Sequence, residues 1–143
     1  MTKEDYKKIE FYLYNYHNIN SLISERENNL IDAIDVSKTA WIKSINDTSN
    51  TMEDQVIKII DDNLIKEYKD WQVFLKRILV FLCEKKPMYY RFLKLKYFLN
   101  KDEVEIAKLM KIDFEKLNNL KIKLVKFIYE IKNKENLELN KEE

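Results

Sequence analysis

The side chains best suited to recognition chemistry lie on a predicted helix that begins near Phe114. Asparagine can form two hydrogen bonds with the edge of adenine, and an apolar side chain can contact the methyl group of thymine. If this helix enters the major groove of DNA, its exposed N-terminal face contacts the base edges. The side chains predicted on that face are Phe114, Glu115, Asn118, Asn119 and Ile122. They favour an A/T-rich site, and the glutamate suits a cytosine amino group.

Basic side chains surround that helix and are distributed unevenly along the chain. The net charge is only +1. Residues 85–134 contain fourteen Lys or Arg and six Asp or Glu, so this segment carries +8 and the remainder −7. Such asymmetry is typical of a protein in which one part contacts phosphate, although solvated lysines on helix faces are the alternative. The predicted phosphate contacts are Arg91, Lys94, Lys96, Lys111, Lys116, Lys121, Lys123 and Lys126.

Two helices joined by a tight turn must position these side chains. The first is predicted over Asp102–Met110, the turn at residues 111–112, and the second helix from Phe114. The carboxylate of Asp113 is expected to cap the second helix. Ala107 leaves room where two helices cross near a right angle. The side chains predicted to face inward are Ile106, Ala107, Met110, Ile112, Leu117, Leu120 and Leu124.

This two-helix stretch resembles the region-four helix-turn-helix of bacterial sigma factors, which joins a Glu-Ile-Ala-x-x-Leu helix to a Gly-Ile-Ser turn. The matching residues are EVEIAKLMKIDFEKLNNLKIKLVKFI, Glu103 to Ile128. The stretch is also similar to the C-terminal half of small phage-encoded late-gene activators of the RinA/ArpU kind, whose N-terminal half often has a tyrosine-rich start like FYLYNY. The resemblance implies a DNA-binding transcriptional regulator with double-stranded DNA and RNA polymerase as partners.

Three residues depart from the sigma pattern. Lys111 replaces the glycine of the turn, so a residue with a Cβ atom is expected to take a positive φ at a cost of roughly 1 kcal/mol. Phe114 occupies a position that is normally polar, and Asn119 stands where arginine is frequent.

The composition indicates an all-α, soluble protein. The 143 residues include no glycine and one proline, whereas hairpin turns and sheet bulges commonly need glycine. The single cysteine, Cys83, excludes an internal disulfide and suits a reducing cytosol. The chain shows no apolar N-terminal run of the signal-peptide kind, and ILVFLC at residues 78–83 is too short to span a bilayer. We therefore expect a cytoplasmic protein without a membrane partner.

The rest of the chain is predicted to form long helices. The first, from Glu4 to Ala33, carries three-four apolar spacing broken at Arg26. This seam predicts packing on the second long helix or self-association into a homo-oligomer. The spaced apolar residues are Ile9, Tyr12, Tyr16, Ile19, Ile23 and Leu30. Its tyrosines, Tyr6, Tyr12, Tyr14 and Tyr16, are interpreted as packing residues rather than a stacking platform for single strands.

Further elements follow from turn and cap signals. Residues 35–50 are rich in Ser, Thr, Asn and Asp and predict a break. A central helix is expected from Thr51, capped with Asp54, to Glu84, with a broad apolar stripe that must be covered on more than one side. Its predicted stripe is Val56, Ile57, Ile60, Leu64, Tyr68, Trp71, Phe74, Leu75, Ile78, Leu79 and Leu82. The next helix is predicted over residues 87–98, and the polar tail from Asn133 is expected to fray.

Catalysis has little support in this sequence. His17 is the only histidine, and Cys83 lies in an apolar run where its thiol stays protonated. The adjacent carboxylates Asp61 and Asp62 have no partner cluster, so no metal site is indicated. A glycine-rich phosphate loop is impossible without glycine. The chain is therefore predicted to be a non-enzyme without cofactors.

The sequence thus predicts an all-α protein with three parts: a helical hairpin or oligomerisation half over residues 1–84, a sigma-like helix-turn-helix over 85–132, and a polar tail over 133–143. The favoured function is DNA-binding transcriptional regulation, as in a phage or prophage late-gene activator. The alternative is a non-enzymatic assembly protein, such as a phage packaging or scaffold subunit, in which the C-terminal motif serves only as packing.

Overall fold

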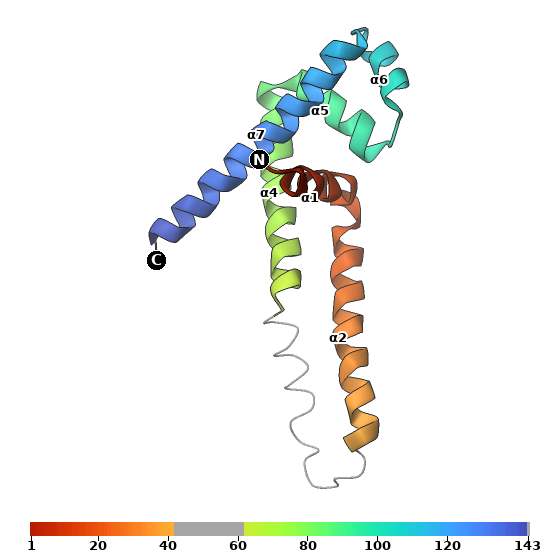
Figure 1. Ribbon diagram of the computed structural model, residues 1–143, viewed down its shortest axis with the longest axis vertical. Helices are drawn as coiled ribbons and strands as arrows, with labels where there is room; N and C mark the ends of the chain where they lie inside the picture. The colour runs from red at the N-terminus through yellow and green to blue at the C-terminus, as the bar shows by residue number, and fades with distance from the viewer. Residues whose placement is uncertain (42–61, 143) are drawn as a thin grey trace. The chain divides into compact units, whose positions relative to one another are not determined.

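The predicted all-α fold is confirmed. The computed structural model describes residues 1–41 and 62–142, with side chains described to residue 32 and over 62–136, and this part of the chain contains helices and no β-strand (Figure 1). By its contacts the chain divides into two compact units. The smaller unit is Asn18–Gln72, and the larger unit combines Met1–His17 with Val73–Glu143. The contacts thus group the first residues with the C-terminal helices. The predicted boundary at residue 84 separates a helical half from a helix-turn-helix by their expected functions, and it stays a prediction.

The predicted single helix from Glu4 to Ala33 is wrong, because the chain breaks at Asn15. Helix α1 spans Lys3–Tyr14, a 3₁₀ turn (η1) covers Tyr16–Asn18, and α2 spans Ile19–Trp41. The side-chain amide of Asn15 donates to the carbonyl oxygen of Phe11 at 2.8 Å, and its backbone amide donates to the same oxygen at 3.0 Å. Asparagine competes in this way with the helical ladder, so the predicted coiled-coil seam is interrupted.

Polar pairs join the two helices of the smaller unit. Arg26, which interrupts the apolar spacing, binds both carboxylate oxygens of Asp62 at 3.1 and 3.2 Å. This contact holds the pKa of the Asp62 carboxyl below its usual range. Gln72 donates to the Asn20 side chain at 2.9 Å. The buried apolar residues of this unit are Ile19, Ile23, Ile65 and Trp71.

Helix α4 spans Asn63–Lys85 and begins with the Asp62 carboxylate accepting from the amide of Ile65 at 3.0 Å. The predicted helix from Thr51 therefore does not continue unbroken through Asp62, because this residue caps a new helix. Thr51, Asp54 and the apolar residues at 56, 57 and 60 lie outside the described residues. Ile65 is buried while Leu64 is only half-buried, so the predicted stripe is shifted by one residue there.

The break predicted over residues 35–50 is wrong for residues 35–41, because these residues belong to α2, which extends to Trp41. Residues 42–50 lie outside the described part of the chain. The polar residues at the end of α2 thus do not stop the helix before Trp41.

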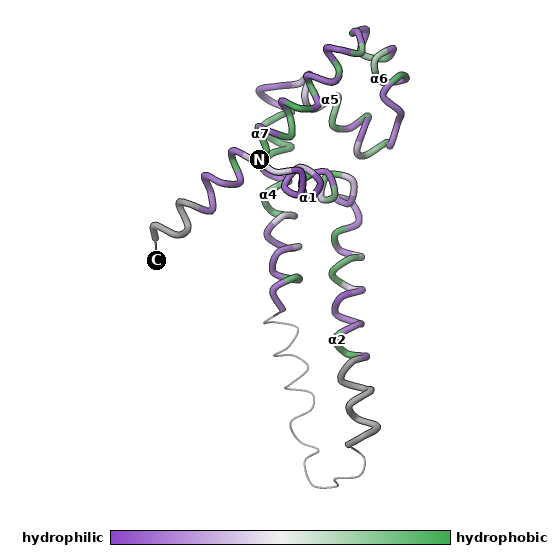
Figure 2. The backbone as a smooth tube through the Cα atoms, in the orientation of Figure 1, coloured by the Kyte–Doolittle hydropathy of each residue, from purple (hydrophilic) through white to green (hydrophobic). Residues whose placement is uncertain are grey.

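The larger unit packs the second part of α4 against α7, which spans Phe114–Glu142. Figure 2 shows hydrophobic and hydrophilic residues alternating in bands along α7, as an amphipathic helix requires. Arg77 and Glu135 form an ion pair at 3.0 Å, and the rings of Phe81 and Phe127 stack with centroids 5.7 Å apart. The core of this unit is Ile9, Tyr12, Leu13, Phe74, Leu75, Ile78, Leu82, Phe92, Leu93, Tyr97, Ile106, Leu117, Leu120, Leu124, Val125 and Ile128.

Two shorter elements follow α4 along the chain. Helix α5 spans Pro87–Leu93 and starts with proline, where the missing amide is harmless. The predicted helical span of residues 87–98 is confirmed, but its last five residues, Lys94–Phe98, form a π-helical turn (η2). This turn closes with the Leu99 amide donating to the Lys94 carbonyl at 2.9 Å. Helix α6 then spans Glu103–Met110.

The predicted fraying of the chain from Asn133 is also wrong, because α7 continues to Glu142. The ion pair of Glu135 with Arg77 gives the helix a contact beyond Asn133. Among the described helices, none is both long enough and apolar enough to cross a bilayer.

Candidate nucleic-acid interface

The turn between α6 and α7 has the backbone conformation that the sequence predicts. Lys111 adopts φ 57° and ψ 43°, a left-handed conformation that glycine would take without steric cost. The amide of Ile112 donates to the carbonyl of Ala107 at 3.1 Å, which closes the end of α6. The expected positive φ at the glycine position of the sigma pattern is therefore confirmed.

Aspartates cap both helices of the pair. The Asp102 carboxylate accepts from the amide of Glu105 at 2.8 Å at the start of α6. The Asp113 carboxylate accepts from the amide of Lys116 at 2.7 Å at the start of α7, so its predicted capping role is confirmed. These caps fix where each helix begins and hence which side chains of α7 face solvent.

The inward face of the pair is largely the predicted one. Ile106, Leu117, Leu120 and Leu124 are buried, whereas Ala107, Met110 and Ile112 are half-buried at the edge of the contact. Sequence reasoning about this pair did not include Val125 and Ile128, which are also fully buried. Their three-residue spacing on α7 is the signal that could have found them.

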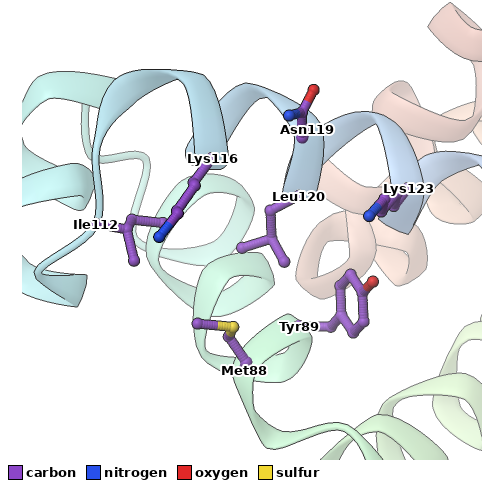
Figure 3. Close-up of a pocket in the computed structure, with 7 residues that line it drawn as sticks. All are labelled: Met88, Tyr89, Ile112, Lys116, Asn119, Leu120 and Lys123. Atoms are coloured by element: carbon purple, nitrogen blue, oxygen red, sulfur yellow. The ribbon is translucent and has the colours of Figure 1, made fainter.

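All five side chains predicted to contact base edges are exposed to solvent. Phe114 is 54% exposed and Ile122 is 45% exposed, although both are large and apolar. The exposed polar residues of this set are Glu115, Asn118 and Asn119. The Asn119 amide points away from α5, as Figure 3 shows. This arrangement leaves hydrogen-bonding and apolar groups on one side of α7 available to a ligand.

Two of the predicted phosphate contacts are instead held by an internal carboxylate. Lys96 and Lys121 both donate to Oε1 of Glu103, at 3.1 and 2.9 Å, and their side chains are only 12% and 21% exposed. Lys96, which was predicted as a phosphate contact, lies in the π-helical turn and its ammonium binds Glu103 on α6 instead. The hydrogen bonds from Lys121 and Lys96 hold the pKa of Glu103 below its usual range.

The other predicted basic residues are exposed. Arg91 donates to the carbonyl of Leu109 at 3.1 Å, near the end of α6, and the Lys94 ammonium lies over the Tyr90 ring at 5.3 Å from its centroid. The remaining exposed lysines are Lys111, Lys116, Lys123 and Lys126. Six of the eight predicted basic residues therefore stay accessible to phosphate.

Hydrogen bonds and ring contacts join α1 and the following η1 turn to η2. The Tyr97 hydroxyl donates to Glu10 at 2.9 Å, and its ring meets that of Tyr14 edge-on at 4.7 Å. Burial, followed by the charge of Glu10, raises the pKa of the Tyr97 hydroxyl, so it stays a donor. Tyr16 stacks on Phe98 at 5.6 Å. These contacts agree with the packing interpretation of the N-terminal tyrosines.

A cavity between α5 and α7 was not predicted. Its volume is about 330 Å³, and it is lined by Met88, Tyr89, Ile112, Lys116, Asn119, Leu120 and Lys123 (Figure 3). Residues of α5 and α7 lie far apart in sequence, and no local pattern relates them. The cavity shares three residues with the predicted DNA-contacting set: Lys116, Asn119 and Lys123.

Within the described part of the chain, no three metal-ligating side chains gather into a possible metal site. His17 packs edge-on against Phe98 at 4.4 Å, while Cys83 is exposed on α4. Comparison with protein-family models, with curated proteins and with solved structures found no match to this chain.

Proposed function

We propose that this protein is a DNA-binding transcriptional regulator that places the exposed face of α7 in the major groove. The observation that carries the proposal is the capped α6–α7 pair, whose left-handed turn at Lys111 leaves Asn118, Asn119 and Ile122 on an open helix face. Lys111, Lys116, Lys123 and Lys126 flank that face and supply phosphate contacts. Asparagine and isoleucine favour adenine and thymine, so the expected site is A/T-rich.

The resemblance of Glu103–Ile128 to sigma region four supports a role as a phage or prophage late-gene activator in the cytoplasm. Region four contacts both promoter and polymerase, so the proposal includes a contact with RNA polymerase. Self-association through the N-terminal helices would double the DNA contacts, since dimers of such proteins bind two half-sites.

The test uses fluorescence anisotropy with labelled duplexes of A/T-rich and random sequence. We expect the A/T-rich duplex to bind more tightly, and Asn118→Ala/Asn119→Ala to remove that preference, because each bidentate pair contributes about 1–3 kcal/mol of discrimination. Glu130→Ala is the control, since Glu130 is exposed on α7 beyond the recognition face. No duplex binding at low salt would refute the proposal and favour the assembly-protein alternative.

A further inference from the structure

The cavity between α5 and α7 has an apolar floor and a cationic rim. Met88, Ile112 and Leu120 contribute aliphatic and thioether groups, while Lys116 and Lys123 extend along its upper edge (Figure 3). Met88 is 53% exposed although it is large and apolar. A volume of about 330 Å³ accommodates one large apolar side chain. No acidic residue lines this space.

The apolar surface continues beyond the cavity through a series of ring contacts. The Lys86 ammonium lies over the ring of Tyr89 at 5.2 Å and over the ring of Phe127 at 4.9 Å. Phe127 stacks in turn on Phe81, which is 40% exposed. Lys86 therefore adds a third cation beside Tyr89, which lines the cavity. The cavity and its lysine rim are called the groove below.

The spacing of Lys116 and Lys123 indicates which negatively charged ligand fits the groove. Lys116 and Lys123 are seven residues apart on α7, so their Cα atoms are separated by about 10.5 Å along the helix axis. Two carboxylates seven residues apart on a second helix have the same separation, and an apolar residue between them faces the same way.

We propose that this groove binds an acidic amphipathic helix of a protein partner. One apolar side chain of that helix enters the cavity over Met88 and Leu120, and flanking carboxylates pair with Lys116 and Lys123. Recognition of an amphipathic helix by an apolar groove is a recurrent binding mode, and the lysine rim gives this groove its preference for acidic partners. Methionine adapts readily to different apolar side chains.

Binding of such a helix also regulates the proposed function, and this second step rests on DNA recognition by α7. Lys116, Asn119 and Lys123 belong both to the cavity and to the predicted DNA-contacting set. A helix seated in the groove neutralises both lysines and covers part of α7. The acidic helix and DNA therefore compete for the protein.

The test titrates the full-length protein with labelled helical peptides that carry one Leu, Phe or Trp between glutamates at i−3 and i+4, in the absence of DNA. Matched peptides replace the glutamates by lysine or the apolar residue by serine. We expect at least one acidic peptide to bind with salt-dependent affinity, and each matched change to weaken it by about tenfold or more.

Two pairs of variants locate the binding site. Met88→Glu and Lys123→Glu should weaken peptide binding at least about tenfold, because they place a negative charge in the groove. Val104→Glu and Lys108→Glu are the charge-matched controls, since both residues are exposed on α6 and neither lines the cavity. Circular dichroism checks that each variant remains folded.

Absence of binding by every acidic peptide, or equal weakening by variants and controls, would overturn the groove proposal. Decanoate that binds the protein while the peptides do not would also overturn it, in favour of a small-molecule site. Competition is measured separately with labelled duplex. Peptide binding without duplex binding would leave the groove proposal standing and refute the proposed DNA function, whereas duplex binding without peptide binding would do the reverse.

Discussion

Glu103 holds two lysines at the centre of the α6–α7 segment, and its charge can be removed with little change of shape. Glu103→Gln retains one carbonyl oxygen but loses the ionic component of both contacts, which measure 3.1 and 2.9 Å. Ion pairs that stay partly exposed contribute about 0.2–1 kcal/mol each. We expect the variant to lower the free energy of unfolding by about 1 kcal/mol at neutral pH, which corresponds to a decrease in Tm of about 2–5 °C.

The pH dependence of this loss has a defined sign. The pKa of Glu103 is lowered in the folded protein, so its ionised form stabilises the fold above the unfolded pKa of about 4.3. As the pH falls through the lower folded pKa, the carboxylate is protonated and the stabilisation disappears. The difference between the wild-type protein and Glu103→Gln should therefore be full near pH 7 and smaller near pH 3, which lies below the unfolded pKa.

Urea unfolding followed by circular dichroism at both pH values measures this difference. Glu105→Gln is the matched control on the same helix, because Glu105 pairs with Lys101 alone within the described part of the chain and its side chain is 51% exposed. A Glu103→Gln variant no less stable than Glu105→Gln at neutral pH would refute the reasoning. A stability difference that persists unchanged at low pH would refute it as well.

Substitutions at three further positions test the geometry of the α6–α7 segment and its contacts. Lys111→Gly should raise the free energy of unfolding by up to about 1 kcal/mol, because glycine takes the observed left-handed conformation without strain; a destabilised variant in urea would contradict this. Asp113→Ala should lower the free energy of unfolding by about 1 kcal/mol, because the Lys116 amide loses its cap. Asp113→Asn should keep most of the wild-type stability, because asparagine is also a good cap. Tyr97→Phe should lower the free energy of unfolding by about 1 kcal/mol, because it removes the hydrogen bond to Glu10. A thermal midpoint equal to that of the wild type would contradict this prediction.

Local signals sufficed to predict most of the α6–α7 segment. The Asp113 cap and the buried Leu117 and Leu124 follow from side-chain chemistry and spacing within one helical turn. The left-handed conformation of Lys111 was instead expected from the resemblance to the sigma pattern, which has glycine at this position. The composition also predicted the all-α class, since a chain without glycine disfavours tight hairpins.

Features set by contacts between distant residues could not be predicted in this way. The break at Asn15 places Tyr14 and Glu10 against Tyr97, which lies more than eighty residues away in sequence. Helical periodicity across Asn15 continues without interruption, so apolar spacing alone predicted one helix. Lys96 lies in the π-helical turn and binds Glu103, a contact that the local sequence does not indicate. The groove between α5 and α7 likewise depends on the tertiary packing of these two helices.

The salt dependence of duplex binding tests the central claim most directly. The affinity of a DNA-binding protein falls with salt with a slope of about −0.9 per phosphate contact. Four lysines flank the recognition face, and Arg91 and Lys94 add two further exposed cations, so we predict a slope between about −3.5 and −5.5. A slope near zero, or no binding at low salt, would contradict the claim that α7 presents a DNA-binding surface.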